Sequence, residues 1–361
     1  MRVGLDWRPT YGQRGGIPVY VRRLAAAYAE RFPADELRLY GHQLRRRAAG
    51  PGTAAGPAGA RLHDLRLPSR AVDALARFGV GADRLVGGCD VFHLTDYAWL
   101  RPTRAPLVAT VHDVLFLELP RCYTADMRRG LLAFTRRVVR SAARIVVPSV
   151  RAKSGLVERL GADPARVDVV PHAPRDLPDV PAAREARPYL LTVGTLEPRK
   201  NHARLLDAYA RLRASGVEVD LVVAGAPGWL DDDIRARLAA SPGVRYEGAV
   251  SDERLGALYR GAVALAYPSL GEGFGLPVLE GLHLGVPVVT SAGTACADVA
   301  GESALLVDPY DVDALADGLA RILSDRALRD DLVRRGRARA AAFTWTRTAE
   351  ATRESYVRAA G

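Results

Sequence analysis

The sequence predicts an α/β protein of two doubly wound, Rossmann-like domains with parallel sheets that face a cleft. Short apolar runs alternate with amphipathic helical patterns in two blocks, and the proline-rich segment 173–188 (APRDLPDVPAAREARP) separates the blocks. Strands that are apolar almost throughout are typical of parallel sheets covered by helices on both faces. Ligands of such sheets bind at the carboxyl ends of the strands, so we look for functional residues there.

The first block opens on a short apolar strand, followed by a glycine-bearing loop and a helical pattern over 18–31. Leu131, Phe134, Val138 and Val139 are spaced so that they lie on one face of a helix, which predicts a helix in this region. Segment 45–60 is of low complexity and rich in glycine and proline, so we expect a surface loop. The expected strands of this block are 2–5, 37–41, 91–94, 107–114, 144–149 and 167–172.

The second block shows the same alternation and ends in two further helical patterns. Its regular succession of strand and helix is what predicts a second doubly wound sheet. The expected strands are 189–196, 219–225, 244–250, 263–269, 287–291 and 304–309, and the expected helices are 201–214, 252–261, 277–284, 311–323, 326–342 and 346–359.

Composition excludes several classes of protein. The chain has 361 residues, is 48% hydrophobic and 25% charged, and has no apolar run long enough to span a membrane. The N-terminus lacks the apolar core of a signal peptide, so we expect no cleaved secretion signal. Three scattered cysteines, Cys89, Cys122 and Cys296, argue against a disulfide framework or a zinc site and suit a reducing cytosol.

The formal net charge of +10 comes from 51 basic and 41 acidic residues, and all the basic residues except Lys153 and Lys200 are arginines. A positive balance favours anionic partners such as nucleotides or an acidic membrane face. The chain has no zinc-finger spacing, aromatic RNA-binding signature or basic tail, so nucleic acid is not an expected partner.

The most informative motif is GEGFGLPVLEGL at 271–282, after an expected strand. Its glycines allow close approach of the backbone to a ligand, and Pro277 can open a helix whose first N–H groups suit a diphosphate. Glu272 and Glu280 can then accept hydrogen bonds from sugar hydroxyls, because one carboxylate can accept from both hydroxyls of a vicinal diol. The alternative is a tight turn followed by a solvated helix residue.

A second motif, GTLEPRKN at 194–201, also follows a strand. Arg199 and Lys200 lie where they can neutralise a diphosphate, the arginine as a fork and the lysine as a point charge. The alternative is a solvated basic pair. A third candidate is His112, beside Asp113 at a strand end, which either hydrogen-bonds a reacting sugar or is a core-edge histidine held by Asp113.

Other signals are weaker. Gly15 and Gly16 precede a helix and can approach phosphates. The acidic run 231–233 has the Asp-x-Asp spacing of metal–diphosphate sites, but acidic residues before a helix also favour its dipole, which is the interpretation we prefer. Neither 271–275 nor 79–84 completes a dinucleotide fingerprint, and the hydrolase elbow and the His-Glu-x-x-His motif are lacking.

Together these residues resemble the retaining glycosyltransferases of the GT-B fold, in sequence family 4, alongside bacterial mannosyltransferases. The resemblance covers essentially the whole chain. Its segments are GGIPVY, VHD, VVPH, GTLEPRKN, YPSLGEGFGLPVLE and the closing helices. The two glutamates with Gly-Phe-Gly between them are specific to this family, and GTLEPRKN is typical of a branch rich in GDP-mannose users.

The resemblance implies roles for these residues. Glu280 would hold the donor's ribose hydroxyls, Glu272 hydroxyls of the transferred sugar, Arg199 and Lys200 the diphosphate, and His112 the sugar near its reacting carbon. The resemblance also implies a larger set of binding positions: Gly15, Gly16, Val250, Gly273, Phe274, Gly275 and Leu276 for the donor, and Tyr97 and Trp99 for the acceptor.

Two departures concern the acceptor side. The chain reads Gly-Gly-Ile-Pro-Val-Tyr where the family often has Gly-Gly-Ile-Gly-Arg-Tyr, and His172 replaces a frequent asparagine. The resemblance implies an acceptor domain over 1–175, a linker over 176–188, a donor domain over 189–342, and a final helix over 343–361 that crosses back to the first domain.

The implied reaction is retaining transfer of a sugar, with mannose from GDP-mannose favoured, to a hydroxyl of a glycan, lipid-linked or small-molecule acceptor. No metal or other cofactor is expected, and the expected location is cytoplasmic, with or without peripheral contact to the inner membrane face. The alternatives are a UDP-, ADP- or dTDP-sugar donor, a nucleotide-sugar 2-epimerase, and a non-catalytic nucleotide-sugar-binding protein.

Overall fold

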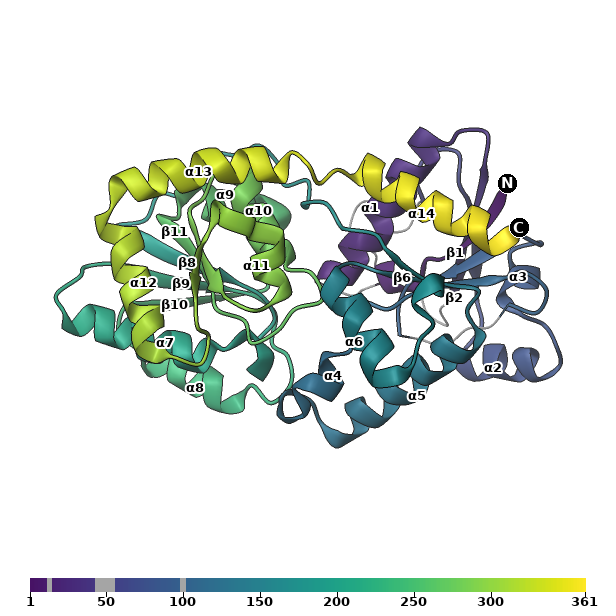
Figure 1. Cartoon of the computed structure of the whole chain (residues 1–361), viewed down its shortest axis with the longest axis horizontal. Helices are drawn as coiled ribbons and strands as arrows, with labels where there is room; N and C mark the ends of the chain where they lie inside the picture. The colour runs from purple at the N-terminus through teal and green to yellow at the C-terminus, as the bar shows by residue number, and fades with distance from the viewer. Residues whose placement is uncertain (12–14, 43–55, 98–101) are drawn as a thin grey trace. The chain divides into compact units, whose positions relative to one another are not determined.

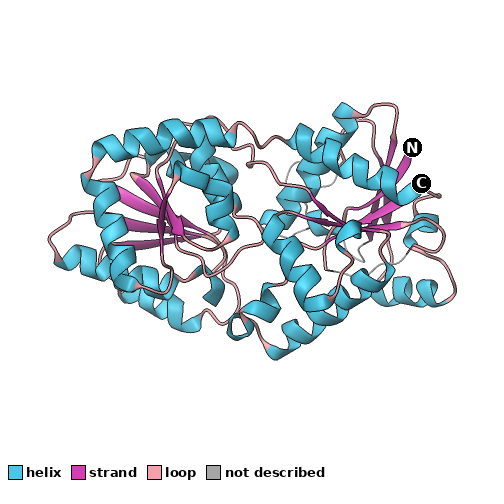
Figure 2. Ribbon diagram, viewed as in Figure 1, coloured by secondary structure: helices cyan, strands magenta, loops and turns pink. Residues whose placement is uncertain are grey.

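The computed structural model describes residues 1–11, 15–42, 56–97 and 102–361 (Figure 1). Their contacts divide the chain into two compact units, each with one sheet flanked by helices (Figure 2). The first unit comprises residues 1–114, 129–172 and 344–361, and the second comprises residues 115–128 and 173–343. The fold class is confirmed, because each unit has a parallel α/β sheet of doubly wound strand order.

The first unit has a seven-stranded sheet in the order β3-β2-β1-β4-β5-β6-β7, with every pair parallel. The order reverses beside β1, which pairs with both β2 and β4. The edge strand β3 was not expected from the sequence, because its residues are half-buried or exposed and form no apolar run. The strands are β1 (Arg2–Asp6), β2 (Glu36–His42), β3 (Arg61–Leu65), β4 (Val91–Leu94), β5 (Leu107–Thr110), β6 (Arg144–Val147) and β7 (Val167–Val169).

One face of this sheet is covered by α1 (Gly16–Arg31) and α14 (Trp345–Ala360), which lie side by side (Figure 1). Tyr20 and Leu24 of α1 and Tyr356 of α14 share one buried cluster with the strands. The C-terminal helix thus completes the core of the unit that holds the N-terminus. The other helices are η1 (Arg8–Thr10), α2 (Ser69–Arg77), α3 (Ala82–Leu85), α6 (Val150–Leu160) and η3 (Pro164–Arg166), together with α5 (Ala125–Ser141), whose residues 125–128 group with the second unit.

The second unit has a six-stranded parallel sheet in the order β10-β9-β8-β11-β12-β13. Its order reverses between β8 and β11, which are neighbours in the sheet but far apart in the sequence. The strands are β8 (Tyr189–Val193), β9 (Asp220–Ala224), β10 (Val244–Gly248), β11 (Ala264–Tyr267), β12 (Val288–Ser291) and β13 (Leu305–Val307).

Helices cover both faces of this second sheet, as its apolar strands predict. One face packs against α7 (His202–Ala214), α8 (Asp232–Ala240) and α12 (Val312–Ser324), and the other against α9 (Asp252–Gly261), α10 (Leu276–Leu284) and α11 (Ala295–Ala300). The remaining helices are α4 (Leu115–Glu118), η2 (Pro120–Cys122), η4 (Pro198–Lys200), η5 (Gly301–Ser303) and α13 (Arg326–Ala340).

Two segments differ from a simple division of the chain at its proline-rich stretch. Residues 173–188 form neither helix nor strand, and they group with the second unit. Residues 115–128, from the first half of the sequence, also group with the second unit. Among the described residues, no helix is both long and apolar enough to cross a membrane.

Gly225, directly after β9, allows a close approach that a side chain would prevent. A Cβ atom at this position would lie 1.8 Å from the carbonyl oxygen of Gly194, so Gly225→Ala must displace the backbone after β8. We expect a loss of about 2–3 kcal/mol in the free energy of unfolding, measured by denaturant titration. Gly130→Ala, on the exposed side of α5 with nothing within 4 Å, is the control and should be neutral or slightly stabilising. Equal stability of the two variants would contradict this account.

Candidate active site

The strongest candidate site lies in the second unit, where the strand order reverses. β8 and β11 are adjacent, and the segments that follow them, 194–201 and 268–275, contain the basic pair and the glycine motif. The Leu270 N–H donates to the carbonyl oxygen of Arg199 at 2.8 Å, and Ser269 Oγ lies 3.0 Å from the same oxygen, so the two segments are in contact. The sheet topology therefore brings together two motifs about 70 residues apart in the sequence.

Asn201 fixes the turn that carries the basic pair. It is buried and has left-handed backbone angles (φ 62°), which asparagine tolerates better than most residues. Its side-chain amide donates to the carbonyl oxygens of Pro268 (3.0 Å) and Pro309 (2.7 Å). These bonds hold the end of η4 to the segment after β11 and to the loop before α12.

Glu272 is buried and bound by both members of the basic pair. Lys200 Nζ donates to Glu272 Oε1 at 2.7 Å, and Arg199 Nη1 donates to Oε2 at 2.6 Å. The hydroxyls of Ser269 and Tyr267 also donate to Oε1, at 2.6 and 2.9 Å. The alternative of a solvated basic pair is therefore wrong, since the side chains of Arg199 and Lys200 are each only 12% exposed.

These partners control the ionisation of Glu272. Burial raises the pKa of its carboxyl group, but Arg199, Lys200 and the hydrogen bonds outweigh burial and lower this pKa to about 2. Tyr267 is shifted the other way, because burial and the neighbouring carboxylate raise the pKa of its phenol. At neutral pH the tyrosine is therefore a neutral donor and Glu272 a carboxylate.

A second buried carboxylate, Glu197, faces the same basic pair. Its Oε1 accepts from Arg199 Nη2 at 2.5 Å and lies 4.0 Å from Lys200 Nζ. Two cations thus meet two carboxylates, and the formal charge of the cluster is zero. We refer to Glu197, Arg199, Lys200 and Glu272 as the ion cluster.

Glu280 lies inside α10 and belongs to a separate network. It is 2% exposed, and its Oε2 accepts from the Tyr259 hydroxyl at 2.9 Å while its Oε1 lies 3.3 Å from Arg175 Nε. Burial raises the pKa of Glu280, and the neighbouring Arg175 opposes this. Glu280 is therefore a held, buried acid, and the alternative of a solvated helix residue is wrong.

The glycines of the motif lie against packed groups. A Cβ atom on Gly271 would come within 2.9 Å of Leu115 in α4, and one on Gly275, which has φ +110°, within 3.0 Å of Cys296. Phe274 points into the core and contacts Phe343 edge-on, with ring centroids 5.9 Å apart. Any contact of Phe274 with a ligand must therefore come from its backbone.

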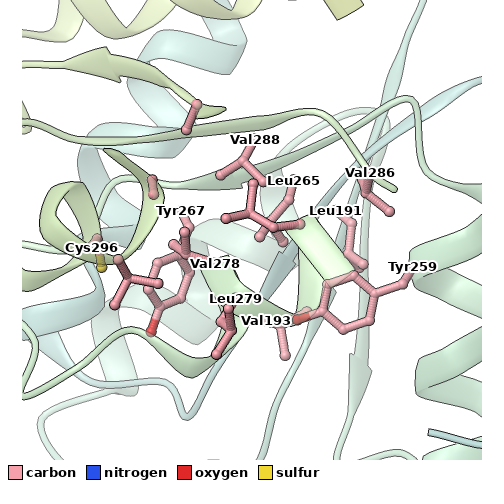
Figure 3. Close-up of a cluster of buried hydrophobic side chains, with 14 of the residues drawn as sticks. Leu191, Val193, Tyr259, Leu265, Tyr267, Val278, Leu279, Val286, Val288 and Cys296 are labelled. Carbon is pink, nitrogen blue, oxygen red and sulfur yellow. The ribbon is translucent and has the colours of Figure 1, made fainter. Parts of the chain in front are cut away.

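Figure 3 shows the aliphatic side chains that surround the rings of Tyr259 and Tyr267. Each ring lies in the core while its hydroxyl reaches one of the two motif glutamates. The core thereby fixes a donor beside each acid.

His112 follows β5 in the first unit, because that strand ends at Thr110. Its Nε2 lies 3.0 Å from the carbonyl oxygen of Thr95, which can only accept, so Nε2 carries the proton. The rings of Tyr20 and His172 lie at 5.4 and 5.9 Å from His112. Burial lowers the pKa of His112, opposed by the Thr95 carbonyl, so the neutral form is favoured.

The remaining candidates are dispersed over both units. Gly15 (φ +117°) and Gly16 begin α1, and Val250 follows β10 and packs on the second core. Tyr97 contacts the Asp113 backbone through its hydroxyl, at 3.2 and 3.3 Å, whereas Trp99 lies outside the described residues. Gly273 and Leu276 lie on either side of Gly275, the N-cap of α10.

The acidic run 231–233 begins α8. Asp231 Oδ2 accepts from the Gly228 N–H at 3.3 Å and pairs with Arg235. This fits the helix-start interpretation, with two further acids in the first turn. No group of three or more His, Cys, Asp or Glu side chains within the described ranges is arranged to hold a metal ion.

Comparisons with known proteins identify the family. The model of "Glycosyl transferases group 1" matches residues 175–339, and that of "Glycosyltransferase Family 4" matches residues 14–173. O-antigen chain mannosyltransferase B of Escherichia coli is 33% identical over an alignment of 264 residues, and the match covers 69% of this chain and 69% of the relative. The chain belongs to glycosyltransferase family 4. It is an enzyme of the glycosyltransferase class, and the resemblance seen in its motifs is confirmed.

Other relatives extend the family match over almost the whole chain. D-inositol 3-phosphate glycosyltransferase of Salinispora arenicola is 30% identical, and the match covers 97% of this chain and 88% of the relative. Solved structures share the GT-B fold: HepE of Anabaena with UDP-glucose (TM-score 0.76, 14% identity, 98% of each chain) and sucrose-phosphate synthase of Thermosynechococcus elongatus (TM-score 0.74, 21% identity, 99% and 98%).

Several residues of the site were not singled out from the sequence. Glu197 lies inside GTLEPRKN, and Tyr267 and Ser269 directly precede the glycine motif, so their nearness to known candidates was a usable signal. Arg175 and Tyr259 had no such signal, because neither lies in a motif with Glu280 and only the fold brings them to it.

Removing the charge of Glu272 should destabilise the protein and flatten its response to acid. Glu272→Gln leaves Arg199 and Lys200 with one buried carboxylate partner fewer, and we expect a loss of about 3–5 kcal/mol at neutral pH. Because the folded-state pKa lies below the unfolded value, the contribution of Glu272 is present above about pH 4.5 and is lost as pH falls toward 2. The difference in the free energy of unfolding between wild type and variant, measured by urea titration, should therefore become smaller as pH falls over that interval.

Glu218→Gln, at an exposed position before β9, is the matched control and should not change stability at any pH. If the difference in unfolding free energy between wild type and Glu272→Gln stays constant from pH 7 to acid pH, the charge of Glu272 does not stabilise the fold.

Proposed function

We propose that the protein is a retaining glycosyltransferase that moves mannose from GDP-mannose to a hydroxyl of a glycan, lipid-linked or small-molecule acceptor. The ion cluster carries this proposal, because it places two fixed cations and a buried carboxylate at the strand-order reversal of one sheet. Parallel α/β sheets bind their ligands at such reversals.

The donor is proposed to bind the second unit, with its diphosphate at the basic pair and the first N–H groups of α10. Those groups, in the Gly273–Leu276 segment, are suited to an anion because a helix start has unpaired donors and a positive dipole end. Glu272 accepts hydrogen bonds from both cations in this structure. The diphosphate would replace Glu272 as their partner and release its carboxylate to accept hydrogen bonds from the sugar.

Glu280 is proposed to hold the ribose hydroxyls, with the base near Val250. From the first unit, Gly15 and Gly16 are proposed to serve the phosphates, His112 the sugar, and Tyr97 and Trp99 the acceptor. Because His112 is neutral with its proton on Nε2, it would contact the sugar through a hydrogen bond and not through a positive charge.

In the proposed reaction the glycosyl–phosphate bond breaks while the acceptor oxygen bonds the anomeric carbon on the same face. The acceptor proton passes to an oxygen of the departing diphosphate, so atoms and charge balance. Negative charge grows on the leaving group, and Arg199 and Lys200 stabilise it most in the transition state, which is where binding accelerates a reaction. We propose that these cations serve without a metal ion or other cofactor.

Mannose is favoured because O-antigen chain mannosyltransferase B is among the similar relatives, and because GTLEPRKN is present in this chain. HepE, which shares the fold, was solved with UDP-glucose, so a UDP-sugar is the second candidate donor.

The donor can be identified by thermal denaturation with GDP-mannose, UDP-glucose, ADP-glucose and dTDP-glucose. We expect GDP-mannose to raise the melting temperature most, since binding to the folded state alone stabilises it by mass action. The same donor alone should stay unchanged over hours of incubation, whereas conversion to a second nucleotide sugar would indicate an epimerase. No shift with any of the four donors would overturn the proposed function.

Lys200 should matter for turnover more than for binding. Hydrogen bonds to charged groups contribute about 1.5–3 kcal/mol, so Lys200→Met should lower kcat about 10- to 100-fold in a transfer assay. The chain offers a matched control in its other lysine, Lys153, whose Nζ donates to the Val167 carbonyl in the first unit. Lys153→Met should have the kcat of wild type. If Lys200→Met instead raises the KM for the donor and leaves kcat unchanged, Lys200 contributes to donor binding and not to the transfer step.

A further inference from the structure

Arg175 lies in the segment 173–188, outside every motif, yet it bridges two acids of the second unit. Its Nε is 3.3 Å from Glu280 Oε1, and its Nη1 donates to Asp252 Oδ1 at 3.0 Å. The arginine side chain is 20% exposed, Glu280 2% and Asp252 55%. Arg175 therefore connects α10, through Glu280, with the first residue of α9.

The surroundings of Glu280 give this contact its importance. Glu280 is a fully buried acid, and burial of a carboxylate without compensation favours its neutral form. Three groups act on it: Arg175 is a cation, Tyr259 is a neutral donor, and Asp252 is a further acid. Of these three, only Arg175 supplies positive charge.

We propose that Arg175 is a positioning residue that keeps Glu280 ionised and oriented to accept both hydroxyls of a nucleotide's ribose. The inference rests on the proposed function, which places the ribose at Glu280. A carboxylate can accept two hydroxyl hydrogens, whereas a protonated carboxyl has one oxygen occupied by its own proton. Through Asp252 the same arginine ties Glu280 to the helix that follows Val250, the proposed base position.

The expected pH dependence follows from the shift on Glu280. Burial already raises its pKa and Arg175 opposes this, so loss of Arg175 raises it further. In the variant Glu280 would therefore lose its proton at a higher pH than in wild type, and its protonated form would bind a ribose poorly. Raising the pH should ionise Glu280 and restore binding, so the defect is large at neutral pH and small in alkali.

The rival interpretation is that Arg175 only tethers its segment. Arg260 is a matched control for this, because it holds the same segment without contacting Glu280: its Nη1 donates to the Pro178 carbonyl at 3.0 Å and its Nη2 lies 3.3 Å from Asp179. A merely structural role predicts equal effects of Arg175→Met and Arg260→Met.

The test measures dissociation constants by calorimetry for whichever of GDP, UDP, ADP and dTDP wild type binds most tightly. At about pH 7 we expect weaker binding by Arg175→Met, because the protonated form of Glu280 accepts one hydroxyl fewer, and near-recovery at about pH 9. Arg175→Lys should bind close to wild type, and Arg260→Met should match wild type at both pH values. Two results would overturn this inference while leaving the proposed function intact. In the first, wild type binds the nucleotide and Arg175→Met binds it equally tightly; in the second, Arg175→Met binds it more weakly by the same factor at both pH values.

A second measurement needs no ligand. If Arg175 holds Glu280 ionised, Arg175→Met should lower the melting temperature at about pH 8 more than at about pH 5, because a raised carboxyl pKa costs stability as pH rises. Adding Glu280→Gln to Arg175→Met should remove that pH dependence. Its persistence in the double variant would overturn the inference, and failure of wild type to bind any of the four nucleotides would overturn the proposed function with it.

Discussion

The buried pairing of Glu272 with Arg199 and Lys200 is the interaction on which the second unit's site depends. Burying charges is costly, and a buried ion pair persists only where geometry and additional hydrogen bonds compensate. Ser269 and Tyr267 supply those bonds to Glu272, and Glu197 balances the second positive charge. The ion cluster is therefore held in shape by its own charges, and this prior ordering of the two cations is what the proposed diphosphate site requires.

The strand order explains why these groups meet. Because β11 inserts beside β8, the segments after both strands leave the same edge of the sheet, and hydrogen bonds between them fix the basic turn to the glycine motif. Asn201 adds two bonds to backbone carbonyls, so the turn is determined by buried polar contacts. Unpaired backbone groups are costly when buried, so the two carbonyl oxygens that Asn201 pairs would lose stability if the turn changed its conformation.

The sequence was sufficient where apolar runs or motifs carried the information. The alternation of strands and helices, Glu272, Glu280 and the basic pair could all be found in this way, because buried parallel strands and glycine turns leave local patterns. The edge strand β3 could not, because a half-exposed strand lacks an apolar run. Nor could the contact of Arg175 with Glu280, because the two residues are about a hundred positions apart and the pairing exists only in the fold.

The two motif glutamates show why residue type alone was not enough. Glu272 and Glu280 are both buried, yet burial is overcome in one and prevails in the other, so their pKa values move in opposite directions. Glu272 has two cations and two hydroxyls, whereas Glu280 has one cation at 3.3 Å that it shares with Asp252. An acid with such weak compensation responds strongly to a single neighbour. The proposed ribose contact at Glu280 would therefore depend on a segment without secondary structure, and substitution of Arg175 in that segment would act on Glu280 through charge.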